Sequence, residues 1–441
     1  CTQLKETKTM LLNFAVTNYR SIKERQVFSM MAVDGLPHKK TLIHSKDGAS
    51  ILPVALLFGA NASGKSNVLR AFGMMRYMVK NSVRLNPDDP LDDYDPFRLD
   101  KESRNNNTEV EIEFIIHEGK DKEQHYLYGF AFTEEKIAEE WLYQQGENTN
   151  KVKLFVRNGV DIQIDEEVFP EGKDKEGTLA SNRLFLSLIA QLNGEKSKGI
   201  IEWFKKSSFA SALHTEQYMT LTSRILKTQK EKEKEKMVYK KYAQMALTFL
   251  RNIDMRIKDL SITEEQVKNL PKDMPEVLKE FLSDKEGKFI RVESKHDVYN
   301  KNGESIDEEV FNVRQHESEG TQKIIELLGF IFTILGEGRL FIIDELDAKL
   351  HPLLTRAIIQ LFTDRKINRH GAQLIFTTHD TNQLNLDYVR RDEIWFTEKS
   401  CVETTELYSH IEFKEFDPSM DITEQYVDGR YGAIPRIKMQ R

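Results

Sequence analysis

Apolar and polar positions follow a different period in each part of the chain. Residues 10–33 alternate between the two, which predicts two β-strands around the turn Asn18-Tyr19-Arg20-Ser21. A continuous apolar run over 51–58 is typical of a buried strand, and helical spacing over 66–79 predicts a helix shortly after it. This part of the chain therefore combines sheet-forming segments with a strand–loop–helix unit.

The middle of the chain interrupts this order. Residues 81–108 are rich in Pro, Asp and Asn and predict a connection, whereas four short alternating segments over 109–165 predict an antiparallel sheet. Helical spacing follows over 183–193 and 199–206. Residues 224–250 predict a further helix around the charge run KEKEKEK, either a solvated face laced with ion pairs or a basic docking face.

An α/β pattern returns from residue 317. Strand candidates at 255–262 and 288–296 precede it. The elements expected after it are, in chain order, a helix over 319–336, a strand over 339–344, a helix over 352–363 and strands over 372–377 and 393–397.

The expected fold class is α/β, a nucleotide-binding domain with a mixed sheet and a large α+β insertion. Residues 1–80 and 311–441 are expected to form that domain together. Residues 81–165 would be its antiparallel β segment. Residues 166–310 would be a mainly helical insertion, interpreted as a sensor or partner-binding region.

The loop after the apolar run carries a phosphate-binding motif. Residues 59–66 match G-x-x-x-x-G-K-[ST], and a chance glycine-rich turn is the alternative. The two glycines let backbone N–H groups close around phosphate oxygens. The lysine supplies a positive charge to the β and γ phosphates, and the hydroxyl of Ser66 can ligate Mg²⁺. The residues expected to bind ATP here are Gly59, Asn61, Ser63, Gly64, Lys65, Ser66 and Asn67.

Paired carboxylates follow the apolar strand over 339–344. Asp344 is expected to hold Mg²⁺, and Glu345 to polarise the attacking water, unless both form an ordinary solvated turn. His379 follows the strand over 372–377 and is expected to contact the γ-phosphate, although a lone histidine is often structural. A metal carboxylate and a base are thus both predicted downstream of the phosphate loop.

Taken in order, these motifs resemble the series of ABC-type ATPases. The segments that resemble the Walker B, D-loop and H-switch motifs are Glu345-Leu-Asp347, His351-Pro352 and Thr377-Thr378-His379. Ser318 and Gly320 match the signature L-S-G-G-Q, whereas Glu317, Glu319 and Thr321 depart from it.

That resemblance implies a nucleotide sandwiched between two subunits. Ser318 and Gly320 would then serve the site of the other subunit in a homodimer or a higher assembly, and Asp347 of the D-loop is a further residue expected to bind the nucleotide. A serine hydroxyl and free amides at a helix start suit a γ-phosphate. The charge of Glu319 must point away from the triphosphate or be neutralised.

Two further segments narrow the resemblance. The turn Asn18-Tyr19-Arg20-Ser21 resembles the N-F-R-S turn of the SMC, RecF and Rad50-like branch, which implies that Arg20 approaches the nucleotide. The ending over 426–435, with DPFRL and NRLFLSLIAQLN, resembles the small bacterial ATPases called AAA15 or RloA/AbiL-like. This resemblance implies phage defence beside a separately encoded effector, often a nuclease.

Charge and composition restrict the partners. The net charge of −7 argues against coating of nucleic acid through bulk electrostatics and leaves open only a local basic patch. No apolar run reaches the roughly 20 residues that cross a bilayer. Cys1 and Cys401 provide no disulfide framework, so a cytoplasmic protein without membrane association is expected. Cys1 is interpreted as part of an extended start rather than as a lipidation site.

Other functions compete with the dimeric ATPase switch. A self-contained nuclease of the OLD type needs a further domain, for which too few residues follow His379. A transporter motor lacks so large an insertion, and a DNA-tethering arm protein needs long heptads that the sequence does not show. A DNA-binding ATPase of DNA repair, and an ATP-binding scaffold that holds a partner inactive, stay open.

Overall fold

The computed structural model describes residues 9–118, 122–145, 150–212, 219–227, 237–253, 256–266 and 288–435. The chain divides into two compact units. The first contains Cys1–Ser211, Glu337–Leu346 and Ile358–Arg441, and the second contains Ala212–Gly336 and Asp347–Ala357. Each unit is described by itself. Among the described residues, none of the helices has the length and apolar character that a bilayer span requires.

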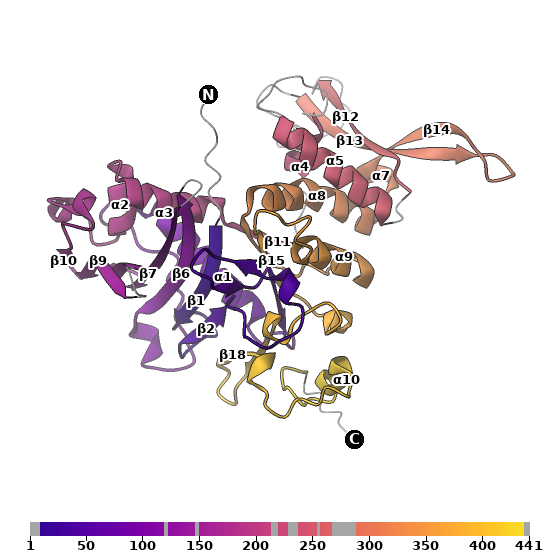
Figure 1. Ribbon diagram of the computed structural model, residues 1–441. Coiled ribbons are helices and arrows are strands. Elements are labelled where there is room, and N and C mark those ends of the chain that lie inside the picture. Colours follow the sequence, from indigo (N-terminus) through magenta and orange to yellow (C-terminus); the bar gives the residue numbers. More distant parts are fainter. Residues whose placement is uncertain are drawn as a thin grey trace. The chain divides into compact units, whose positions relative to one another are not determined.

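A seven-stranded antiparallel sheet in the first unit joins the two predicted strand regions. Its order is β10-β9-β8-β7-β6-β1-β2. The strands are β1 (Thr9–Thr17), β2 (Gln26–Ser29), β6 (Thr108–Glu118), β7 (Lys122–Phe132), β8 (Ile137–Gln145), β9 (Lys151–Asn158) and β10 (Asp161–Ile164). β1 pairs with β6, for example Phe14 with Ile112, so the β segment after the phosphate loop is continuous with the first strands (Figure 1).

The second sheet of this unit carries the motif strands. Its order is β11-β15-β16-β5-β17-β18, parallel except for the last pair. The strands are β5 (Val54–Phe58), β11 (Ser208–Ser211), β15 (Leu340–Asp344), β16 (Gln373–Thr377), β17 (Ile394–Lys399) and β18 (Thr405–Ser409). A short hairpin, β3 (Ile43–His44) and β4 (Ser50–Ile51), precedes β5. The two sheets and their helices form a mixed α/β architecture, so the predicted α/β fold class is confirmed.

Helix α1 (Lys65–Asn81) packs in the core shared by the two sheets. It begins at Gly64, and its Phe72 lies 5.6 Å from Phe14 of β1 and 6.4 Å from Trp203, measured between ring centroids. Trp203 belongs to α3 (Glu195–Lys206), which follows α2 (Phe185–Gln191). The side chain of Gln373 in β16 bonds both backbone groups of Leu11 in β1. Apolar packing and this amide therefore fasten one sheet to the other.

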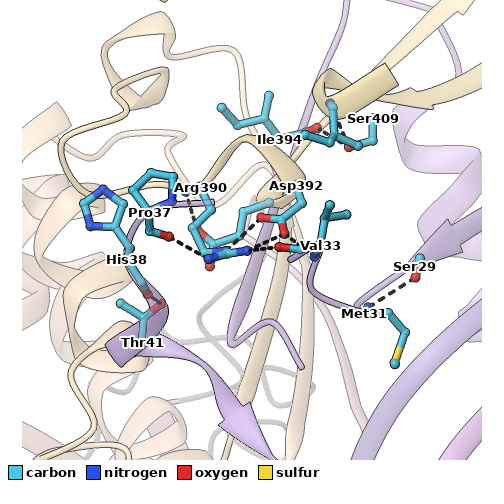
Figure 2. Close-up of polar contacts among 12 residues, drawn as sticks. Ser29, Met31, Val33, Pro37, His38, Thr41, Arg390, Asp392, Ile394 and Ser409 are labelled. Carbon is cyan, nitrogen blue, oxygen red and sulfur yellow. Dashed lines mark hydrogen bonds and ion pairs between the residues drawn. The ribbon is translucent and has the colours of Figure 1, made fainter. Parts of the chain in front are cut away.

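A buried ion pair holds the segment after β2 against the turn before β17. Arg390, 1% exposed, donates to both carboxylate oxygens of Asp392 at 2.9 and 2.7 Å. Its other hydrogen bonds go to the carbonyls of Pro37 and Val33 at 2.6 and 3.0 Å (Figure 2). The Val33 N–H in turn donates to Asp392. A guanidinium and a carboxylate are buried here because each finds several partners.

The second unit combines helices with a small antiparallel sheet. Its elements are α4 (Met219–Lys227), α5 (Met237–Asn252), β12 (Asp259–Gln266), β13 (Lys288–Tyr299), β14 (Ser305–Asn312), α7 (Val313–His316), α8 (Glu319–Glu337) and the start of α9 (Pro352–Thr363). The hydroxyl of Thr222 in α4 accepts the Gly329 N–H of α8 at 3.1 Å. A Cβ on Gly329 would lie 2.5 Å from the Cα of Thr222, so glycine permits the close approach of α4 and α8.

The borders of the units differ from the expected ones in three places, one of which is the segment Asp347–Ala357, expected in the nucleotide-binding domain but part of the second unit. Residues 166–211 belong to the first unit, because Phe185 and Trp203 pack in its core. Residues 311–336 belong to the second unit, where Glu317 bonds His296 of β13 at 2.8 Å. The region 166–310 also contains β11, β12 and β13 and is thus mixed rather than mainly helical.

The predicted elements recur within a few residues of their expected bounds. β14, β18 and α10 (Ile422–Val427) were not anticipated. The charge run KEKEKEK and Cys1 lie outside the described residues, so the expectations for both stay untested.

Candidate functional site

The loop between β5 and α1 is packed so closely that its two glycines admit no side chain. A Cβ on Gly59 would lie 2.5 Å from the carbonyl oxygen of Thr397 in β17. A Cβ on Gly64, which has φ of 108°, would overlap the hydroxyl of Thr405 in β18. Both glycines therefore serve the close packing of the loop as well as its backbone conformation.

Hydroxyl groups hold this loop to the neighbouring strands. Ser63 Oγ lies 2.6 Å from Thr397 Oγ1, and Thr405 Oγ1 donates to the Ser63 carbonyl at 2.9 Å. The turn before β2 joins the same network through Ser21, whose hydroxyl lies 2.8 Å from Thr405 Oγ1. It also accepts from Asn67 Nδ2 at 2.7 Å. Elements far apart in the chain thus fix the shape of the loop.

Lys65 is directed back into the loop. Its side chain is buried, and its Nζ donates to the carbonyls of Gly59 at 2.7 Å and Ala60 at 3.2 Å. An ammonium group placed among these carbonyls is available for exchange onto a stronger acceptor such as a phosphate oxygen. The phosphate contact predicted for Lys65 is compatible with this position.

The carboxylates predicted after β15 lie at the end of that strand beside β16. Thr377 Oγ1 donates to Asp344 Oδ1 at 2.6 Å and accepts the Glu345 N–H at 2.7 Å. Glu345 has φ of 57°, a left-handed conformation that costs energy in a residue with a side chain. Because β16 also pairs with β5, both carboxylates belong to the edge of the sheet at which the phosphate loop begins.

One cavity of about 500 Å³ brings most of the predicted residues together, a size typical of ligand pockets. It is lined by Ser21, Asn61, Ala62, Ser63, Gly64, Lys65, Ser66, Asn67, Arg70, Glu345, His379 and Lys399. Gly59 and Asp344 are not among the lining residues. The Gly59 carbonyl accepts from Lys65, which lines the cavity, and Asp344 is linked to the lining residue Glu345 through the Thr377 hydroxyl. The lining contains three cationic residues, Lys65, Arg70 and Lys399, and one carboxylate residue, Glu345, so the cavity favours an anion.

Arg20 does not line that cavity. Its Nε lies 3.2 Å from Asp95 Oδ2, and its guanidinium stands 5.5 Å from the centre of the Tyr19 ring. It lines a neighbouring depression of about 260 Å³ with Phe97 and Leu99. Ser21 and Lys399 line both hollows. The turn expected to approach the nucleotide therefore contributes Ser21 to the cavity, while Arg20 lies beside it.

The signature and D-loop residues share the second unit. Ser318 caps α8, since its hydroxyl accepts the Thr321 N–H at 3.2 Å. A Cβ on Gly320 would lie 3.0 Å from the carbonyl oxygen of Lys349. Lys349 Nζ also lies 3.4 Å from Glu319 Oε2, so the extra negative charge at the signature has a cationic partner. Asp347 accepts the Leu350 N–H through its carbonyl at 2.9 Å, within the same segment.

Sequence reasoning missed five residues of this site, namely Ser21, Arg70, Thr397, Lys399 and Thr405. The first two had a signal, because Ser21 ends the Asn-Tyr-Arg-Ser turn and Arg70 lies one turn after Ser66 on α1. The other three come from β17, β18 and their surroundings, where no motif marks them. Only the pairing of β17 with β5 brings them to the loop.

The comparisons with known proteins agree with a nucleotide-binding domain. A family model described as "AAA domain, putative AbiEii toxin, Type IV TA system" matches residues 54–387, more than half of the chain. No curated protein matches the chain.

Similar solved structures include an "SmcHead bound to the C-winged helix domain of ScpA", which is 12% identical with a TM-score of 0.43. The match covers 90% of this chain and 97% of that chain. An SMC head domain from Thermotoga maritima is 10% identical, with a TM-score of 0.38 and coverage of 90% and 98%. RecF with ATP is 14% identical, with a TM-score of 0.35 and coverage of 92% and 100%.

Proposed function

The chain belongs to the family of AAA domains described with the putative AbiEii toxin and type IV toxin–antitoxin systems, and we propose that it binds ATP and hydrolyses it slowly, as a switch. The observation that supports this is the single cavity lined by Lys65 and Ser66 of the phosphate loop together with Glu345 and His379. Mg²⁺ and a γ-phosphate fit a site with three cations, a hydroxyl and a carboxylate.

One group of residues in and beside the cavity is proposed to bind the phosphates and Mg²⁺. Backbone amides of residues 59–66, with Lys65, would hold the phosphates, and they cost little to reorganise because hydroxyl contacts already fix the loop. Ser66 and Asp344 would hold Mg²⁺, which supplies charge neutralisation between the β and γ phosphates.

The reaction itself needs a base and a γ-phosphate contact. Glu345 would orient the attacking water and accept its proton, and His379 would donate to the γ-phosphate oxygens. The strained backbone of Glu345 is held by the Thr377 hydroxyl, so the base is positioned before any substrate arrives.

The site is proposed to be completed by a second copy of the chain. Ser318 offers a capped helix start, and the Lys349 partner removes the electrostatic objection to Glu319. Donors that arrive only on dimerisation make hydrolysis slow in the isolated chain. The proposed assembly is therefore a homodimer or a higher oligomer with composite ATP sites.

The proposed role in the cell is that of a switch in defence against phage. We place the protein in the cytoplasm as a sensor in anti-phage defence that controls a separately encoded effector, with the region 166–310 as the sensing or partner-binding part. Support comes from the resemblance of the sequence to RloA/AbiL-like ATPases and from the family description. Binding of nucleic acid is not part of the proposal.

Substitution of the base tests the enzymatic core. Glu345→Gln is expected to retain ATP binding, to lower turnover by about 10²–10³-fold, and to accumulate an ATP-bound dimer. Phosphate release and mass photometry with and without ATP measure both effects. Glu202→Gln on α3, half-exposed and paired with Lys205 at the surface, is the matched control. Parental turnover in Glu345→Gln would show that the base is another residue.

A further inference from the structure

Two histidines and two carboxylates meet on one face of the antiparallel sheet, where no function has been assigned. Glu123 and His125 are two residues apart on β7, and His117 of β6 is paired with Glu123 across the strands. Asp47, in the turn of the β3–β4 hairpin, lies against them. The His125 Nε2 to Asp47 Oδ2 distance is 3.2 Å. Because residues two apart on a strand share a face, this convergence follows from the register of β6 and β7.

The donor atoms are spaced like the ligands of one ion. One ligand atom each from Asp47, Glu123 and His125 lies within 4.8 Å of the others. A tetrahedral zinc ion with bonds of about 2.0–2.2 Å separates its ligands by about 3.3–3.6 Å, so only small side-chain adjustments are needed. Two carboxylates and neutral imidazoles also present two negative charges, which a divalent cation balances.

Neighbouring groups already orient the carboxylates. Glu123 Oε2 accepts the Lys46 N–H at 2.6 Å, and Glu123 Oε1 lies 3.2 Å from His117 Nδ1. Asp47 Oδ1 accepts the Ser45 hydroxyl and the Ala49 N–H. Such supporting hydrogen bonds are the usual surroundings of metal ligands, and Asp47 Oδ2 and both carboxylate oxygens of Glu123 keep a lone pair for an ion.

We propose that Asp47, Glu123 and His125 bind a zinc-class divalent cation, with His117 as the residue that orients Glu123. Three protein ligands leave a fourth position for water. The ion joins the β3–β4 hairpin to β7. Since Ile51 of β4 lies only three residues before β5, it would anchor the polypeptide that leads into the phosphate-loop strand. The mixed nitrogen and oxygen donor set favours zinc over magnesium, which prefers oxygen alone.

The test measures zinc binding by the full chain. Protein stripped with EDTA is titrated with ZnCl₂ in excess Mg²⁺ without nucleotide, in an Asp344→Asn background that removes the proposed magnesium carboxylate. We expect about one zinc per chain, and an affinity at least about tenfold weaker in Asp47→Asn and in His125→Gln. His117→Gln is expected to weaken binding about tenfold while leaving the stoichiometry unchanged.

A histidine of the same hairpin supplies the control. His44 is exposed, and its Nδ1 lies 3.3 Å from the Ser50 hydroxyl rather than in the Asp47–Glu123–His125 cluster, so His44→Gln should bind zinc like the parent. Asp47 is exposed in a turn, so Asp47→Asn keeps the test informative even where His125→Gln misfolds. Equal zinc affinity in the parent, Asp47→Asn and His125→Gln, or no zinc bound at micromolar concentration, would overturn the proposal. Neither result would bear on ATP hydrolysis.

Discussion

The hydroxyl of Thr377 lies 2.6 Å from Asp344 Oδ1, where it donates to the carboxylate proposed to hold magnesium. Thr377 Oγ1 also accepts the Glu345 N–H at 2.7 Å. A single side chain on β16 thus orients both acidic residues that follow β15. An isosteric substitution can remove the hydrogen bonds of the Thr377 hydroxyl while it keeps the packing of the side chain.

Thr377→Val should lower turnover by about tenfold and weaken the binding of Mg²⁺, so that a higher Mg²⁺ concentration is needed for half-maximal turnover. The methyl group fills the same space, but Asp344 loses a donor and the Glu345 N–H loses its acceptor, which also costs about 1–3 kcal/mol of stability. Steady-state phosphate release over a range of Mg²⁺ concentrations measures the first effect, and urea denaturation the second. Thr363→Val, which removes a hydroxyl bonded within α9, is the control. Unchanged magnesium dependence would contradict the proposed role.

Gly64→Ala should abolish nucleotide binding. A Cβ there overlaps the hydroxyl of Thr405, and a left-handed backbone adds about 1–3 kcal/mol of strain. Fluorescent ATP-analogue binding and thermal melting measure the two losses.

A comparison with Gly35 separates strain from overlap. Gly35 also has positive φ, of 86°, but a Cβ there meets nothing within 4 Å, so Gly35→Ala carries the strain alone. Gly64→Ala combined with Thr405→Gly should recover part of the binding. If Gly35→Ala and Gly64→Ala behave alike, the overlap with Thr405 is not the cause.

The stability of the first unit should depend on pH through His410. Burial, helped by the neighbouring Arg391 cation, lowers the pKa of His410 to about 3. Its Nδ1 accepts from Arg391 Nε at 3.0 Å, which only the neutral ring can do. The unfolded chain takes up this proton near pH 6.5 and the folded chain near pH 3. Stability from this group is therefore complete well above pH 6.5, begins to fall as the pH approaches 6.5, and declines at a rate that approaches about 1.4 kcal/mol per pH unit until the folded pKa near 3 is reached.

Comparison with His410→Gln isolates the contribution of His410 protonation to the pH dependence of stability. The variant keeps a neutral acceptor but cannot take up the proton, so between pH 6.5 and 5.5 the parent should lose about 1 kcal/mol more than the variant. Urea midpoints at the two pH values measure the difference, with His44→Gln as the exposed-histidine control. Parallel curves for parent and variant would mean that His410 is protonated in the folded protein.

Lys349→Met should slow hydrolysis without destabilising the chain. Its partner Glu319 is 75% exposed, and an exposed ion pair contributes at most about 0–1 kcal/mol. If the start of α8 meets a triphosphate in a dimer, the uncompensated carboxylate opposes its charge, and Glu319→Gln should restore or exceed the parental rate. Turnover at several protein concentrations reports both variants. A rate that is insensitive to both substitutions would place the signature away from the nucleotide.

Local motifs made much of this protein predictable. Three features can each be recognised from a few neighbouring residues: the apolar run before Gly59, the G-x-x-x-x-G-K-S loop and the carboxylates after β15. Helix and strand periods give α1, α8 and β15–β17 to within a few residues. The position of Ser21 in the cavity, in place of Arg20, was not predictable in this way, since Asp95, far along the chain, binds the arginine.

The sequence alone determined which chemical groups are present and in which elements they lie, because backbone preferences and short motifs act over neighbouring residues. Only the tertiary structure decided which of those groups meet. The pairing of β1 with β6 and of β5 with β17 follows from burial of apolar surface contributed by the whole chain. That pairing brings Thr405 against Gly64 and Asp47 against His125, two contacts across long stretches of sequence that no local pattern encodes.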